Sequence, residues 1–139
     1  MVVTVAQNVI LDSSALVALL DPRDQHHAWS RGAVAKLPLP WLTAEAVVVE
    51  AFFLLEGPPV ARLALLLRDG RLRATFGLRD EPKPVLDLMD KYASVPMSLA
   101  DACLVRMTEI VPDPVVVTTD ADFKIYRRHS RHVVPCLMP

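Results

Sequence analysis

Residues 9–20 read VILDSSALVALL, and this stretch decides the fold class. Its first three residues are an apolar run that suits a buried strand, and the run ends at Asp12. Ser13 or Ser14 can then cap a helix that continues through Leu20. A strand followed directly by a helix is the building unit of α/β folds, so we expect more strand–helix pairs along the chain.

The rest of the chain alternates between helical and strand patterns. Helices are expected over residues 25–37, 44–55, 60–68, 82–92 and 98–109, and strands at 72–76, at 115–119 and from Val133 onward. Thr43 is the expected cap of the helix that starts at Ala44. Alternation of this kind predicts an α/β fold with a mostly parallel sheet covered on both faces.

Length and composition indicate one soluble domain over residues 1–139, in which residues 1–8 form an extension before the first strand. The chain has 139 residues, of which 53% are hydrophobic and 22% are charged, and this excludes intrinsic disorder. No apolar run reaches the roughly 18 residues that cross a bilayer, so no membrane contact is expected. Cys103 and Cys136 lack disulfide or zinc spacing, which favours a reduced, cytoplasmic protein.

Basic residues gather near the C-terminus although the net charge is only −1. Lys124, Arg127 and Arg128 lie in a segment without acidic residues and are candidate contacts for the phosphates of a polyanion. The alternative is a solvated helix face with cations near its C-terminus. A second basic stretch runs from Arg62 to Arg73.

Two of the best strand candidates end in a carboxylate, at Asp12 and at Asp120. Parallel sheets place their sites beyond the carboxyl ends of the strands, so both residues are candidate site residues. Helix capping is an equal alternative for each residue taken alone.

Glu50 is the sole ionisable group on an apolar helical segment, AVVVEAFFLL from Ala46 to Leu55. A buried unpaired charge is costly, so Glu50 is expected either to bind a metal ion or to pair with an arginine. Phe52 and Phe53 on the same helix could line a groove for a partner, but large apolar residues on apolar helices are usually core residues, which is the expectation here. Glu45 lies in the first helical turn, where the helix dipole explains its charge.

Asp101 follows Ser98 at the spacing of a capping box, and the apolar residues after it indicate that it faces inward. Asp122 lies two residues after Asp120 and is either a further member of the acidic group or a first-turn residue.

Taken together, these carboxylates can converge above the sheet. A cluster of like charges raises its own pKa values or requires a cation, and an all-oxygen site suits Mg²⁺ or Mn²⁺. Such ions commonly act on phosphate groups.

Four segments of the chain, in order, resemble PIN-domain ribonucleases, and most resemble the VapC-type toxins of bacterial toxin–antitoxin pairs. The segments are ILDSSALVALL from Ile10, LTAEAVVVE from Leu42, LADACL from Leu99 and VTTDADF from Val117.

The resemblance implies a three-layer α/β/α sandwich and a metal-dependent endoribonuclease. It implies that four acidic residues hold Mg²⁺ or Mn²⁺, namely Asp12, Glu50, Asp101 and Asp120. Asp122 would be an occasional fifth ligand. Ser13 and Thr118 match hydroxyl residues that support such a site. The expected partners are an RNA substrate, a cognate antitoxin protein and a second copy of the chain.

Two alternatives stay open. One is another Mg²⁺-dependent phosphoryl hydrolase, such as a phosphatase of the haloacid dehalogenase type, although Asp12 lacks the second aspartate two residues later that this class uses. The other is a catalytically silent PIN-like module that only binds a partner.

Overall fold

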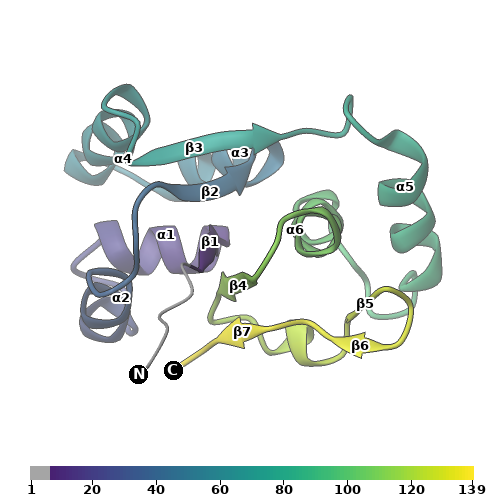
Figure 1. Cartoon of the computed structure of the whole chain (residues 1–139). Helices are drawn as coiled ribbons and strands as arrows, with labels where there is room; N and C mark the ends of the chain where they lie inside the picture. The colour runs from purple at the N-terminus through teal and green to yellow at the C-terminus, as the bar shows by residue number, and fades with distance from the viewer. Residues whose placement is uncertain (1–6) are drawn as a thin grey trace, which may run out of the picture.

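Five strands form the central sheet of the computed structural model, which describes residues 7–139. The strands are β1 (Asn8–Leu11), β2 (Trp41–Ala44), β3 (Leu72–Phe76), β4 (Pro114–Val117) and β7 (Cys136–Leu137). They lie in the order β3-β2-β1-β4-β7 and every pairing is parallel (Figure 1). The expected α/β class with a mostly parallel sheet is confirmed. Of the extension expected at residues 1–8, residues 1–6 lie outside the described residues, and Asn8 already belongs to β1.

Pairs of helices connect consecutive strands of this sheet. They are α1 (Ser13–Leu20) and α2 (His27–Val34), α3 (Glu45–Leu54) and α4 (Pro58–Arg68), and α5 (Pro82–Lys91) and α6 (Leu99–Ile110). The first two connections run in one direction across the sheet and the third returns, so right-handed crossovers place α5 and α6 on the opposite face. Figure 1 shows α1, α2 and α4 on one side of the molecule and α5 and α6 on the other.

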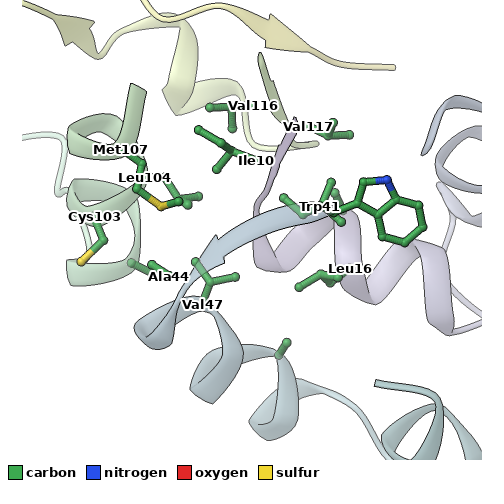
Figure 2. Close-up of a cluster of buried hydrophobic side chains, with 14 of the residues drawn as sticks. Ile10, Leu16, Trp41, Ala44, Val47, Cys103, Leu104, Met107, Val116 and Val117 are labelled. Carbon is green, nitrogen blue, oxygen red and sulfur yellow. The ribbon is translucent and has the colours of Figure 1, made fainter. Parts of the chain in front are cut away.

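The two central strands, β1 and β4, are buried because helices cover both faces of the sheet. Val9, Ile10 and Leu11 are fully buried in β1, as are Val116 and Val117 in β4. This explains why both strands appear in the sequence as continuous apolar runs. Figure 2 shows part of this core, in which Ile10 and Val116 lie beside side chains of α6.

Strand β2 is an element that the sequence pattern did not predict. Thr43 was expected to cap a helix starting at Ala44, but both residues belong to β2, and α3 starts at Glu45 without a side-chain cap. The Thr43 hydroxyl instead donates a 2.8 Å hydrogen bond to the Leu11 carbonyl oxygen. The strand has only four residues, and its pairing with β1 and β3 overrides the helical capping signal.

The basic segment near the C-terminus is not a helix face. A 3₁₀ helix η1 (Ala121–Lys124) is followed by a hairpin of β5 (Arg127–Arg128) and β6 (His132–Val133), which lies outside the central sheet. His129 and Ser130 have positive φ values of 49° and 68°, and they form the turn of this hairpin. The strand expected from Val133 is therefore a hairpin strand, and β7 completes the sheet.

Candidate functional site

The candidate site lies where the carboxyl ends of β1 and β4 meet. The connections that follow these neighbouring strands leave in different directions, and such a switch point is where parallel sheets bind their ligands. Asp12 follows β1, and its backbone N–H donates to the Val117 carbonyl oxygen of β4 at 3.1 Å. Thr118 and Asp120 follow β4, so the two acidic strand ends are brought to the same edge.

Asp12 is buried, at 3% exposed, and its carboxylate accepts four hydrogen bonds. Oδ1 accepts from the Ser13 backbone N–H at 2.7 Å, so Asp12 is the N-cap of α1, and more weakly from the Ser13 hydroxyl at 3.5 Å. Oδ2 accepts from the hydroxyls of Thr118 at 2.7 Å and Ser14 at 3.1 Å. Capping and site membership, first considered as alternatives, are compatible in this one residue.

Burial raises the pKa of Asp12 to about 6, because the charged form loses its hydration. The negative charge of Asp101 raises this pKa further, whereas the hydrogen bonds from Thr118, Ser13 and Ser14 lower it. The carboxylate is therefore held in a position where a cation would relieve an electrostatic cost.

Glu50 joins this group through Ser13. The buried Ser13 hydroxyl donates to Glu50 Oε1 at 2.7 Å, and within residues 7–139 no arginine or lysine forms an ion pair with Glu50. The arginine alternative is thus not seen in the described part of the chain.

The premise that α3 is buried all round was wrong. Phe53 is 85% exposed and Phe52 is also exposed, so neither lies in the core as expected, and Glu50 itself is only half-buried. The apolar pattern of α3 predicted burial on all sides, but one side of the helix faces no other element among the described residues.

Asp101 combines a capping role with a position in the acidic group. The capping box predicted from the sequence is present, since Ser98 Oγ accepts from the Asp101 N–H at 3.0 Å and Asp101 Oδ2 accepts from the Ser98 N–H at 3.4 Å. Asp101 Oδ2 also accepts from the Tyr126 hydroxyl at 2.9 Å. Burial raises the pKa of Asp101, and the charge of Asp120 raises it as well.

Asp120 and Asp122 flank the start of η1. Asp120 Oδ1 accepts from the Asp122 N–H at 2.9 Å and so caps η1, while Asp122 occupies its first turn. The charges of both residues, with that of Asp101, add to burial in raising the pKa of Tyr126. Asp12, Asp101 and Asp120 thus form a chain of electrostatically interacting carboxylates, with Asp122 at its margin.

Comparison with protein families matches residues 9–128 to the PIN domain. The chain belongs to the PIN-domain family. The crystal structure of VapC20 from Mycobacterium tuberculosis, described as a sarcin–ricin loop cleaving toxin, superposes on this PIN domain with a TM-score of 0.74 at 17% sequence identity. The match covers 85% of this chain and 94% of VapC20. No curated protein matches the sequence significantly.

The family assignment confirms the resemblance drawn from the four segments and replaces the dehalogenase-type alternative. No helix among residues 7–139 has the length and apolar character needed to span a membrane.

The donor set of this PIN domain fits a hard divalent cation. Glu50 Oε2, Asp101 Oδ1 and Asp120 Oδ2 accept no hydrogen bond from residues 7–139, whereas the second oxygen of each carboxylate is held by a protein donor. Free carboxylate oxygens are the ligands that Mg²⁺ and Mn²⁺ prefer.

The acidic side chains do not converge as closely as the resemblance implied. In the described part of the chain, no three acidic, histidine or cysteine side chains are arranged to hold a metal ion.

The three basic candidate residues differ in their surroundings. Lys124 is exposed. Arg127 donates from one guanidinium nitrogen to the carbonyl oxygens of three neighbouring residues, and Arg128 donates to the Thr108 carbonyl oxygen at the end of α6. Arg127 and Arg128 therefore hold the hairpin in place, whereas the Lys124 side chain makes no hydrogen bond or ion pair with residues 7–139.

Two residues of the candidate site were not predicted from the sequence. Ser14, considered there only as a helix cap, donates to Asp12 and accepts from the Thr119 N–H at 3.0 Å. Tyr126 lies 25 residues after Asp101, its hydrogen-bond partner, and no sequence pattern indicates that its hydroxyl reaches that carboxylate. A signal for Ser14 was available, because a second hydroxyl residue lies two positions after the strand-end acid Asp12.

Proposed function

We propose that this PIN domain is an Mg²⁺- or Mn²⁺-dependent endoribonuclease that hydrolyses RNA phosphodiesters. The observation that carries the proposal is the series Asp12, Asp101 and Asp120 at the switch point of the sheet, in which the charge of Asp101 raises the pKa of Asp12 and the charge of Asp120 raises the pKa of Asp101. Glu50, linked to Asp12 through Ser13, completes the acidic group that the resemblance implied.

Each residue has a proposed role in this reaction. Asp12, Glu50, Asp101 and Asp120 hold the cation, and Asp122 is an additional ligand. When bound, such an ion activates a water for attack and stabilises charge on the phosphoryl oxygens. Thr118 orients Asp12 through its 2.7 Å hydrogen bond, and Ser13 orients Glu50.

We propose hydrolysis by direct attack of water, in which the Ser13 and Ser14 hydroxyls orient the acidic side chains. The hydroxyls of Ser13 and Ser14 donate to carboxylates, and no histidine contacts either of them among residues 7–139. We therefore expect no covalent enzyme intermediate.

The proposal extends to a toxin role with a cognate antitoxin and to a homodimer. The fold shared with VapC20, a sarcin–ricin loop cleaving toxin, supports the first part. An apolar surface on α3 supports a protein partner: Val49 is 68% exposed and Phe53 85%, and both line a groove of about 620 Å³ with Leu99 of α6. Light scattering of the purified chain tests the homodimer.

The decisive experiment incubates the purified protein with mixed cellular RNA in Mg²⁺, Mn²⁺ or chelator and maps the ends produced. Asp12→Asn and Asp101→Asn should abolish cleavage and stay folded, because an amide keeps the shape and removes the charge that holds the cation. Asp87→Asn is the matched control, since this carboxylate lies exposed on α5 and pairs with Lys83.

Cleavage in chelator, or wild-type rates from folded Asp12→Asn and Asp101→Asn proteins, would contradict the proposal. A wild-type protein that cuts no RNA with either cation would favour the catalytically silent, partner-binding alternative.

A further inference from the structure

Tyr126 is a fully buried tyrosine directly behind the acidic group. Its ring packs edge-on against Tyr92 and Phe123, with centroid separations of 5.2 Å in each case. Phenylalanine would provide the same aromatic packing, because the ring makes these contacts. The hydroxyl therefore needs a separate explanation, since burying a polar group is costly unless it finds a partner.

The partner of this hydroxyl is a proposed metal ligand. Tyr126 donates to Asp101 Oδ2 at 2.9 Å, and the Ser98 backbone N–H approaches the same oxygen at 3.4 Å. Both donors use one oxygen, and Oδ1 accepts no hydrogen bond from residues 7–139. Two donors on one oxygen fix the rotation of the carboxylate and leave the other oxygen free.

We propose that Tyr126 is a positioning residue, whose hydroxyl orients the Asp101 carboxylate for a divalent cation. The inference rests on the proposed function, because it assumes that Asp101 is a ligand. Hydrogen bonds to ligating carboxylates commonly set ligand orientation, and their loss typically weakens metal binding by roughly 10- to 100-fold.

The test compares Tyr126→Phe with Tyr92→Phe. Tyr92 is a matched control because it lies in the same aromatic cluster, and its hydroxyl accepts a hydrogen bond from the Arg127 N–H at 2.9 Å instead of contacting an acid. Mn²⁺ binding is measured by calorimetry without RNA, and metal-free melting curves report folding. We expect Tyr126→Phe to bind Mn²⁺ about 10-fold more weakly and Tyr92→Phe to bind it within 2-fold of wild type.

A double-mutant cycle separates positioning from packing. If the hydroxyl acts through Asp101, adding Tyr126→Phe to Asp101→Asn leaves the remaining Mn²⁺ affinity unchanged. Wild-type Mn²⁺ affinity in Tyr126→Phe, an equal loss in Tyr92→Phe, or an unfolded Tyr126→Phe protein would each overturn the inference.

Failure of the proposed function gives a different result. A wild-type protein that neither binds Mn²⁺ nor cleaves RNA overturns both proposals, whereas a metal-dependent nuclease with an unaffected Tyr126→Phe variant overturns this inference alone.

Discussion

At the scale of single residues, Asp12 serves the fold and the candidate site at once. Its backbone continues the pairing of β1 with β4, its side chain caps α1, and the same carboxylate faces Asp101 across the site. A buried carboxylate with a raised pKa destabilises the folded state whenever it is charged. The residue that organises the site therefore lowers the stability of the metal-free protein.

This cost predicts a pH dependence of stability. The pKa of Asp12 is about 6 in the folded protein, above the ordinary 3.8, so the folded state binds this proton more tightly than the unfolded state. The destabilisation is absent well below pH 3.8, grows as the pH rises from about 4 to 6, and reaches on the order of 2–3 kcal/mol above pH 6. In chelator, the free energy of unfolding of wild type should therefore rise relative to that of Asp12→Asn as the pH falls from 8 to 5. Denaturant unfolding measures both values. If the free energies of unfolding of the two proteins changed equally with pH, the prediction would be wrong.

Glu50 and Glu45 provide a second comparison within one helix. Glu50→Gln should lower RNA cleavage and Mn²⁺ affinity at least about 10-fold with little loss of stability, because glutamine still accepts the Ser13 hydrogen bond. Glu45→Gln, exposed in the first turn of α3, should retain both activities and cost only a few tenths of a kcal/mol. Cleavage assays and calorimetry check both variants, and equal behaviour would remove Glu50 from the proposed ligands.

At the scale of elements, the β5–β6 hairpin is attached to the rest of the domain by arginines. Arg128 reaches the carbonyl end of α6, and Arg127 satisfies three carbonyl oxygens around the end of η1. Hydrogen bonds from a charged donor to otherwise unpaired carbonyls are among the stronger ones. The basic segment is thus divided between structural residues and a free cation at Lys124.

This division predicts opposite phenotypes for neighbouring substitutions. Arg127→Ala should cost about 1–2 kcal/mol of stability, because it removes those hydrogen bonds. Lys124→Ala should leave the melting temperature unchanged and reduce the salt slope of RNA binding by roughly one. Melting curves and RNA titrations at several salt concentrations measure both effects. A normal melting temperature for Arg127→Ala would show that its hydrogen bonds contribute little.

Elements with strong local signals could be predicted from the sequence, and elements fixed by tertiary pairing could not. Strands β1 and β4 are apolar runs because both faces are covered, and the capping box of α6 has a fixed spacing. Strand β2 has four residues and no strand pattern of its own, and β5 and β6 have two each. In the site, the acidic positions followed from strand ends, whereas the Tyr126 hydroxyl depends on three-dimensional packing.

At the scale of the whole molecule, the candidate site is assembled from distant parts of the chain. Asp12 and Asp101 lie at the starts of α1 and α6. Glu50 lies on α3, and Asp120 follows β4. No two of them are neighbours in sequence, so their proximity exists only in the folded domain. Unfolding relieves the repulsion between them, and cation binding requires the fold.

This linkage predicts metal-dependent stability. Mn²⁺ or Mg²⁺ should raise the melting temperature, with a gain of about 2.7 kcal/mol at 100 times the dissociation constant. The triple substitution of Asp12, Asp101 and Asp120 by Asn should abolish the metal response and leave the metal-free protein at least as stable as wild type. Thermal melts of both proteins with and without metal provide the test. An equal response of the triple variant would show that these acids do not share a site.

The strand order has a consequence for how the activity can arise in a cell. Strand β1 is synthesised early, but its neighbour β4 and the residues Thr118 and Asp120 emerge late, after two further strands and six helices. Until then β1 has an open edge, and Asp12 lacks its Thr118 partner. A growing chain on the ribosome thus lacks Thr118 and Asp120, and cannot assemble the proposed site, until β4 and the residues after it have been made. The order of translation delays the activity until nearly the whole domain has been made.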